Sequence, residues 1–399
     1  MIGGRSFLAK TLASTFALIA AGCVSERVER TSSRFILPEP GIPAGPGPTD
    51  SSGSLRWNSI GFVEYDDFTI PLISPDGSRL VSRSGAPPGW EEILANPSST
   101  PLPDATFSIH SIDDELGLGP PLEIRGPWIL GRCADRNGFL IEEPRDDGSR
   151  RIGRVDWITQ DISWLVDDGE VAAFAFIDRD GTIAYSRRDV DDEAFDLVLR
   201  RGDGSGVWEI PSRWGRSWID PVLAPDGRTL FALCRGDGTV ELAWTRTTGE
   251  SRFRDGIRTH PISIRTTPRR VQAMLGPQVG ASSPPATKAR IIFLHPDLAR
   301  LVEWSPGTDL ARPFPEGTIN ATMLGEDMGI AATREGIEYV RLSKGVGQPP
   351  TSLSMTEDTA IPRRLGEYGQ DSRFVLLRPD AGRYEVIIGD LSEQPIPGP

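Results

Sequence analysis

The feature that most constrains the fold of this chain is a short turn that recurs between runs of alternating apolar and polar residues. It is clearest in PLISPDGSRLVSRSG (71–85) and DPVLAPDGRTLFALCRGDG (220–238), and weaker in GRCADRNGFLIEEPRDDG (131–148) and AFAFIDRDGTIAYSRRD (173–189). Asp-Gly or Asn-Gly between two alternating runs is a strong β-hairpin signal, because the turn requires residues that tolerate a positive φ. The chain is therefore predicted to be built from β-hairpins.

The spacing of these turns indicates a repeated unit. The clear turns and three fainter ones are anchored at Gly77, Gly138, Gly181, Gly227, Pro277, Asp327 and Asp371. After a long first interval they lie about 43 to 50 residues apart, which accommodates four short strands per repeat, as in the blades of a β-propeller. Seven anchors predict an all-β propeller with seven four-stranded blades, and six or eight blades stay open because the last three anchors are weak.

The first and last strands are expected to meet. In the last repeat we place strands at Pro362–Tyr368, Phe374–Arg378 and Tyr384–Gly389, and no fourth strand follows. An unassigned strand, Leu55–Tyr65, precedes the first repeat. We expect it to join the last blade and close the ring, because an unpaired sheet edge would otherwise promote aggregation.

The fourth repeat is regular enough to place all four strands. They are expected at Trp218–Leu223, Thr229–Cys234, Thr239–Arg246 and near Ser251–Ile257.

The two best turns carry a family resemblance. Ser74-Pro75-Asp76-Gly77, and nearly so Ala224-Pro225-Asp226-Gly227, resemble the PD40 repeat of TolB-like β-propellers. The resemblance implies that each turn joins the innermost strand of a blade to the second strand. It implies nothing about a ligand.

The N-terminus has the three parts of a secretory signal. Arg5 and Lys10 give a positive start, an apolar stretch runs over 11–21, and small residues lead to Cys23. The apolar stretch is too short for a permanent transmembrane helix. The segment Ala20–Cys23 resembles the lipobox of bacterial lipoproteins, although Ala20 stands where leucine is usual.

That resemblance implies a division of the chain into a lipoprotein signal peptide at 1–22, a tether at 23–54 and a propeller domain at 55–399. Cleavage would precede Cys23, and the cysteine would carry the lipid that attaches the protein to a membrane of the cell envelope, facing the periplasm or the exterior. The Pro-, Gly- and Ser-rich segment 24–54 fits a semi-extended tether. An ordinary secretory signal with an incidental Cys23 is the alternative.

The net charge of the chain limits the kind of partner that it can bind. The chain carries 43 Lys and Arg against 56 Asp and Glu, a net charge of −13. A nucleic-acid partner would require a basic face, so we expect none. We expect a monomer that binds an unknown protein, peptide or glycan, with no cofactor.

Several residues are candidates for functional sites, but a structural role is the favoured interpretation of each. Cys133 and Cys234 fall in separate repeats and are expected to be buried thiols, and three histidines, His110, His260 and His295, are few for a metal site. Asp178–Gly181 and Asp135–Gly138 resemble the start of a calcium loop but lack its final glutamate. Trp208, Trp214 and Trp218 would suit carbohydrate stacking, but filling the space between blades is the simpler interpretation.

Two functions follow from this sequence. The favoured one is a membrane-anchored, non-catalytic binding or scaffold module, because no nucleophile elbow, Walker loop or zinc-protease motif is present. The alternative is a hydrolase or lyase with carboxylates in the propeller channel, for which Asp220, Glu326 and Glu367 are the candidates.

Overall fold

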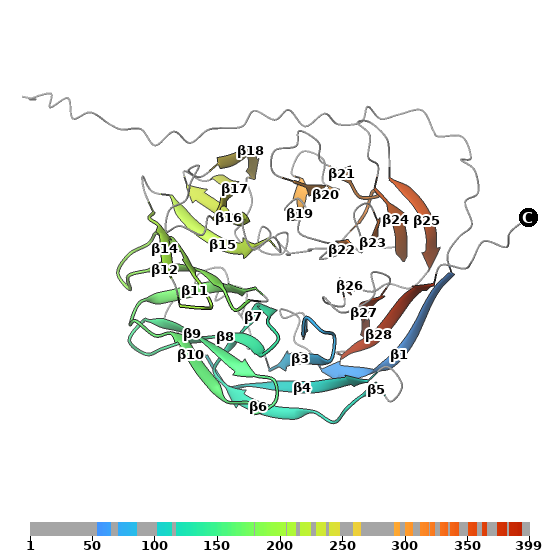
Figure 1. Cartoon of the computed structure of the whole chain (residues 1–399), viewed down its shortest axis with the longest axis horizontal. Helices are drawn as coiled ribbons and strands as arrows, with labels where there is room; N and C mark the ends of the chain where they lie inside the picture. The colour runs from blue at the N-terminus through green and yellow to red at the C-terminus, as the bar shows by residue number, and fades with distance from the viewer. Residues whose placement is uncertain are drawn as a thin grey trace, which may run out of the picture.

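A computed structural model gives the fold (Figure 1). It describes residues 54–64, 71–85, 102–113, 117–178, 180–204, 206–212, 216–224, 229–236, 239–247, 258–264, 291–295, 300–305, 312–318, 320–323, 328–333, 336–342, 350–356, 361–364, 373–380 and 383–392. Throughout these ranges the regular structure is β-strand. None of them contains a helix with the length and apolarity needed to span a bilayer.

The strands form sheets arranged around a ring, as the blades of a β-propeller are (Figure 1). The first sheet contains β2 (Leu72–Ile73), β3 (Arg79–Ser84), β4 (Ala105–Asp113), β5 (Gly117–Leu118) and β6 (Leu122–Gly126). The next is eight-stranded and contains β7 (Ile129–Ala134), β8 (Gly138–Pro144), β9 (Arg150–Asp156), β10 (Ile162–Val166), β11 (Val171–Ile177), β12 (Ile183–Arg188), β13 (Asp196–Arg200) and β14 (Val207–Ile210). The all-β propeller expected from the turns is confirmed.

The eight-stranded sheet divides into two antiparallel meanders, β7–β10 and β11–β14. They are joined through a single parallel pairing between Val171 and Arg150. Within each meander the pairings are antiparallel. Each meander therefore has the four strands expected of one repeat.

The remaining sheets lie along the rest of the ring in Figure 1. The third contains β15 (Ser217–Leu223), β16 (Thr229–Gly236), β17 (Thr239–Arg246) and β18 (Arg258–Ile264). The fourth contains β19 (Ile291–His295), β20 (Arg300–Trp304) and β21 (Arg312–Pro313). The fifth contains β22 (Asn320–Met323), β23 (Met328–Ala332), β24 (Ile337–Arg341) and β25 (Thr351–Thr356).

The last sheet joins the two ends of the described chain. Its strands are β26 (Ile361–Arg364), β27 (Arg373–Asp380), β28 (Arg383–Ser392) and β1 (Ser54–Glu64). β1 pairs with β28 antiparallel, from Ser54 opposite Ser392 to Glu64 opposite Arg383. The N-terminal strand thus supplies the fourth strand of the C-terminal sheet.

Two sequence-based placements differ from the structure. The strand that pairs with β17 is Arg258–Ile264, later than the predicted 251–257, which lies outside the described residues. The hairpin of the fourth sheet is β19–β20, connected through 296–299, whereas the predicted anchor Pro277 lies outside the described residues.

The resemblance-bearing turn is stabilised by its own side chains. The Ser74 hydroxyl donates to the Asp76 carboxylate at 2.6 Å, which also accepts the Ser78 N–H at 3.0 Å. Gly77 has φ +73°, the region where glycine avoids a Cβ clash. Partial burial acts to raise the pKa of Asp76, but the hydrogen bonds from Ser74 and Ser78 together outweigh it and lower that pKa. Aspartate at this position therefore holds the turn closed.

Apolar side chains fill the interfaces between neighbouring sheets. Between the β7–β10 and β11–β14 meanders the buried cluster is Leu140, Ile152, Val166, Ala172, Ala175, Ile177, Ile183, Tyr185 and Val198. Between β11–β14 and β15–β18 it includes Trp208 and Trp218. The strand faces alternate, so that one face of each sheet packs against the sheet before it and the other against the sheet after it.

Candidate functional site

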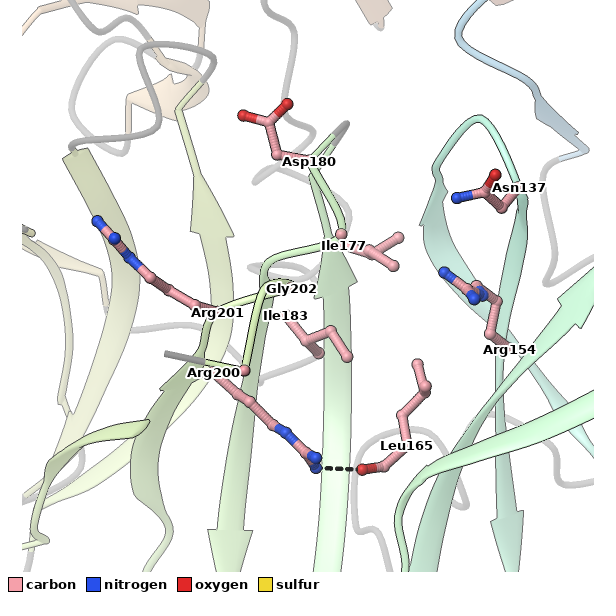
Figure 2. A pocket seen from close by; sticks show the side chains of 11 residues that line it. Asn137, Arg154, Leu165, Ile177, Asp180, Ile183, Arg200, Arg201 and Gly202 are labelled. Atoms are coloured by element: carbon pink, nitrogen blue, oxygen red, sulfur yellow. Dashed lines mark hydrogen bonds between the residues drawn. The ribbon is translucent and has the colours of Figure 1, made fainter. Parts of the chain in front are cut away.

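A pocket of about 330 Å³ lies between the β7–β10 and β11–β14 meanders (Figure 2). Three turns meet there: the β7–β8 turn, the β11–β12 turn and the β13–β14 turn. Its size is at the lower end of the range for small-ligand sites. It is therefore the candidate site for recognition of a small molecule or of one group of a larger partner.

The β7–β8 turn positions one side of the pocket. The Asp135 carboxylate accepts the N–H groups of Asn137 at 2.9 Å and Gly138 at 2.7 Å. It also pairs with Arg154, with Nη1 3.1 Å from Oδ2. The Asp135 side chain is 1% exposed and that of Arg154 is 30% exposed, so the buried acid orients a guanidinium that reaches the pocket.

The β11–β12 turn forms the opposite side. The Asp178 carboxylate accepts the N–H groups of Asp180 at 2.9 Å and Thr182 at 2.8 Å. Gly181 has φ +77°, which completes the turn and turns the Asp180 side chain outward (Figure 2).

The backbone of the β13–β14 turn packs directly against the backbone of the β11–β12 turn. A Cβ added at Gly202 would lie 2.4 Å from the Asp180 carbonyl oxygen, so only glycine allows this approach. The close contact carries the two arginines before it, Arg200 and Arg201, to the pocket rim.

Arg200 reaches across from one meander to the other. Its Nη1 donates to the carbonyl oxygen of Leu165 on β10 (Figure 2). Arg201 stacks over Trp208, with its guanidinium carbon 5.3 Å from the ring centroid. Val207 lies directly opposite Arg200 in the β13–β14 ladder and is 52% exposed, so its side chain stands beside Arg200 on the same face.

The floor of the pocket is apolar. Ile177 and Ile183 are 2% and 4% exposed, and Leu165 is half-buried. The guanidinium groups of Arg154, Arg200 and Arg201 lie at the rim. The three turns also carry the carboxylates of Asp135, Asp178, Asp180 and Asp203, so the pocket has charged groups of both signs.

A backbone hydrogen bond to a buried carboxylate links the two meanders. Phe174 has φ +57° at a bulge in β11, and the register shifts between Ala173 and Phe176. The bulge turns the Ala175 N–H out of the ladder, and the Glu142 carboxylate on β8 accepts it at 2.9 Å. Arg150 on β9 pairs with the other Glu142 oxygen at 3.2 Å. Both side chains are almost fully buried, at 3% and 7% exposed, and burial lowers the pKa of Arg150 while Glu142 opposes that shift.

The two calcium-like segments are hairpin turns. The carboxylates of Asp135 and Asp178 accept backbone N–H groups of their own turns. Within the described ranges no cluster of three or more His, Cys, Asp or Glu side chains is arranged to hold a metal ion.

Of the three residues proposed for channel catalysis, the structure describes one, so their convergence stays a hypothesis. Asp220 is 0% exposed and lies at a bulge of β15 with φ +54°. Glu326 and Glu367 lie outside the described residues.

The predictions that Trp208 and Trp218 fill the space between blades and that Cys234 is a buried thiol are confirmed. Trp208 and Trp218 are 7% and 5% exposed and pack in the sheet interface, as expected of filling residues, while Trp214 is outside the described ranges. Cys234 is a buried free thiol, and burial raises its pKa to about 11. The side chain of Cys133 and the lipid-attachment candidate Cys23 lie outside what the structure describes.

Sequence reasoning missed this pocket because its residues come from two repeats and three turns. Aligning the repeats on their turn glycines would have placed Asn137 and Asp180 at equivalent positions, one residue before Gly138 and Gly181. Arg200 and Arg201 could not be placed in this way, because no repeat-anchoring Asp-Gly or Asn-Gly turn was recognised next to them.

No protein-family model matches the sequence, and no curated protein matches it. Solved structures do. TolB from Acinetobacter baumannii is 19% identical over 47% of this chain and 44% of that chain, with a TM-score of 0.32. A puromycin hydrolase is 16% identical over 79% of this chain and 51% of that chain, with a TM-score of 0.44. The Dos1 propeller is 10% identical over 84% of this chain and 96% of that chain, with a TM-score of 0.44.

The chain spans about half the length of the TolB and puromycin hydrolase structures.

Proposed function

We propose that this chain is a lipid-anchored, extracytoplasmic β-propeller that binds a partner without chemically changing it. In this proposal the pocket between the β7–β10 and β11–β14 meanders receives an anionic group of the partner. The guanidinium groups of Arg154 and Arg200 at that pocket are the observation that supports it. Arginine is the side chain best suited to such recognition, because its planar fork of donors matches carboxylate and phosphate oxygens.

The composition of the pocket favours binding over catalysis. The 11 described residues that line it include no histidine, cysteine, serine or lysine, and Asp180 is the acidic member. Nucleophilic or general acid–base catalysis usually requires a base next to a nucleophile or a second titratable group. Neither arrangement is found among these described residues.

The proposal also covers the number of blades and the closure of the ring. We take the propeller to have seven blades, two of them formed by the halves of the eight-stranded sheet. The antiparallel pairing of β1 with β28 supports a ring closed by the N-terminal strand. Such closure would leave the anchor segment 23–54 directly before a strand of the last blade.

The anchor is tested on the full chain expressed in a bacterium with labelled palmitate. We expect label on the wild-type protein and its recovery in the membrane fraction. The Cys23→Ser variant should lose both the label and the membrane association. A Cys23→Ser protein that stays membrane-bound would contradict the anchor and would leave the propeller untouched.

The pocket is tested by site-specific photo-crosslinking in intact cells. A photo-reactive residue in place of exposed Val207 should give an adduct, and the adduct should disappear when Arg200→Glu is added. The same residue in place of Leu122, which is 42% exposed on β6, serves as the control. An adduct at Leu122 alone, or one at Val207 that persists with Arg200→Glu, would contradict binding at the pocket.

A further inference from the structure

The first and last sheets meet where β5 lies against β1 (Figure 1). β5 pairs with the end of β4, with Ile112 opposite Leu118 and Asp113 opposite Gly117. A Cβ added at Gly117 would lie 2.7 Å from the Ile60 carbonyl oxygen of β1. Gly117 also has φ +88°, so both the close contact and the backbone conformation require glycine. A short strand of the first sheet is thus in direct contact with the backbone of the last sheet.

The backbone of β1 changes course at the same place. Its ladder with β28 shifts register between Ser59 and Gly61. Gly61 has φ +146°, and a Cβ added there would lie 3.0 Å from Leu118 Cδ1. One glycine on each strand, at a bulge in one of them, therefore allows a closer approach than side chains would permit.

Apolar side chains bury this contact. Ile112 and Leu118 of the β4–β5 hairpin pack against a buried cluster in which the last sheet predominates. That cluster contains Ile60, Val63, Leu80, Val375, Leu377, Tyr384, Val386 and Ile388. Because removing apolar surface from water is favourable, the cluster stabilises the arrangement in which β5 rests on β1.

The hairpin is fixed to the first sheet by contacts that do not involve β1. The Ile112 N–H donates to the Ser78 carbonyl oxygen at 2.8 Å, and the Gly119 N–H donates to the Ser111 carbonyl oxygen at 2.9 Å. The His110 ring nitrogen Nδ1 lies 3.0 Å from the Gly119 carbonyl oxygen. β5 is therefore a fixed projection of the first sheet that reaches the last sheet.

β1 is the strand that such a contact would stabilise most. Among the described strands it comes first in the chain, forms the outer edge of its sheet and has one ladder, with β28. Terminal segments held by few contacts open at the lowest free-energy cost. Without a further contact, β1 would therefore separate from its sheet more readily than the inner strands would.

We propose that β5 is a latch that keeps β1 in the last sheet, through Gly117 against Ile60 and Leu118 against Gly61. When the latch is displaced, β1 separates from β28 while the other sheets stay folded. The last sheet then loses its outer strand without global unfolding. This inference goes beyond the proposed function, because it concerns the β1–β28 pairing and does not depend on what the pocket binds.

The test is hydrogen–deuterium exchange on the full chain, wild type against Gly117→Ala. The added methyl group meets the Ile60 carbonyl and strains the backbone. We expect peptides that cover 54–64 and 383–392 to exchange about tenfold faster, as strain of this kind predicts. Peptides that cover 139–156 should exchange as in wild type.

Gly169→Ala is the matched control. Gly169 has φ +79°, and a Cβ added there would meet nothing within 4 Å. The variant therefore introduces a similar backbone strain without a contact to displace. Exchange in 54–64 and 383–392 should equal that of wild type.

Leu118→Ala is a second, milder variant. It removes the apolar side chain that lies on Gly61 and leaves the conformation of Gly117 unchanged. The same two segments should exchange faster than in wild type, by a smaller factor than in Gly117→Ala. This variant tests the latch even where Gly117→Ala does not fold.

Three results would overturn the latch. The first is unchanged exchange in 54–64 in both variants. The second is faster exchange confined to peptides that contain residues 112–118. The third is equal acceleration in 139–156, because Gly117 and Leu118 would then support the whole fold and not β1 in particular. The crosslinking experiment at Val207 is independent of all three.

Discussion

Two neighbouring interfaces in this propeller contain the same kind of backbone bulge but surround it with different side chains. Each of the inner strands β11 and β15 has a bulge whose first residue is left-handed, Phe174 with φ +57° and Asp220 with φ +54°. In β11 the second bulge residue is Ala175, whose N–H is accepted by Glu142 of the preceding meander. In β15 it is Pro221, which has no N–H to satisfy.

The surrounding side chains differ accordingly. Glu142 and Arg150 face the β11 bulge from the β7–β10 meander, and Arg154 lies on the same face. On the corresponding face of β11–β14 stand Ser186, Phe195 and Leu199, which are buried. One interface is thus polar and opens into a charged pocket. The next, which we call the dry interface, has a serine and two apolar side chains at the corresponding positions, with the buried Asp220 at its bulge. In a repeat fold, therefore, the side chains of one interface can change while the backbone of the repeat stays the same.

The largest effect should come from breaking the polar interface. Glu142→Ala removes the partner of Arg150 and the acceptor of the Ala175 N–H, and leaves a buried cation uncompensated. We expect a loss of about 3–5 kcal/mol in the free energy of unfolding, measured by urea denaturation. Ser186→Ala, at the corresponding position of the dry interface, is the matched control and should cost less than about 1 kcal/mol.

A combined change should recover part of that loss. Glu142→Ser, Arg150→Phe and Ala175→Pro together give the polar interface the residue types of the dry one. Replacing a buried ion pair by apolar groups is often neutral, so the triple variant should be more stable than Glu142→Ala. A triple variant less stable than Glu142→Ala would show that the two interfaces are not equivalent.

The converse change should have a smaller effect. Pro221→Ala introduces an N–H at a buried bulge, where the residue that corresponds to Glu142 is a serine. We expect a cost of about 1–3 kcal/mol, because a buried donor without a good acceptor keeps its desolvation penalty. An increase in stability in the same urea assay would show that this bulge already offers an acceptor.

Alkaline pH should weaken the polar interface through Tyr185. Burial raises the pKa of Tyr185 to about 12 from the ordinary 10.0. The unfolded chain ionises first, so the stability contributed by the neutral phenol is complete below pH 10 and falls as the pH rises towards 12. Tyr185→Phe should therefore lose less stability than wild type between pH 9 and pH 11, by about 1 kcal/mol. Parallel losses in the two proteins would contradict this.

The smallest effect is expected at the turn beside the pocket. Backbone N–H groups of Thr159 and Ile158 lower the pKa of Asp156. The stability from this exposed carboxylate is present above its unfolded pKa near 3.8 and is lost as the pH falls through the lower folded value. Asp156→Ala should narrow the difference in thermal midpoint between pH 5 and pH 3 by a degree or two, as calorimetry can measure. A wider difference would contradict the assignment.

The turns made much of the fold predictable. Asp76, Asp135 and Asp178 accept N–H groups of their own turns, so Asp-Gly and Asn-Gly marked hairpins by local chemistry alone. Thr239–Arg246 is a strand with the predicted bounds because its alternation is regular. The β19–β20 hairpin was misplaced because a long Pro-rich connection, 265–290, separates it from the preceding strand, and β18 was misplaced because the connection before it is longer than the sequence pattern indicated.

The site was not predictable in the same way. Glu142 acts on Ala175, 33 residues later, through a bulge that no residue type announces. Arg154 and Arg200 meet at one pocket because two meanders pack side by side, which is a property of the ring and not of either repeat. Cys23 remains a prediction from its own segment.

Hydrogen–deuterium exchange on the full chain, with and without the partner captured by the Val207 crosslink, tests most directly whether this pocket is the binding site. We expect slower exchange in peptides that cover 135–138, 178–183 and 200–206, with no change in β15 or in the β1–β28 pair. Protection confined to other segments, with these three turns unchanged, would contradict the account.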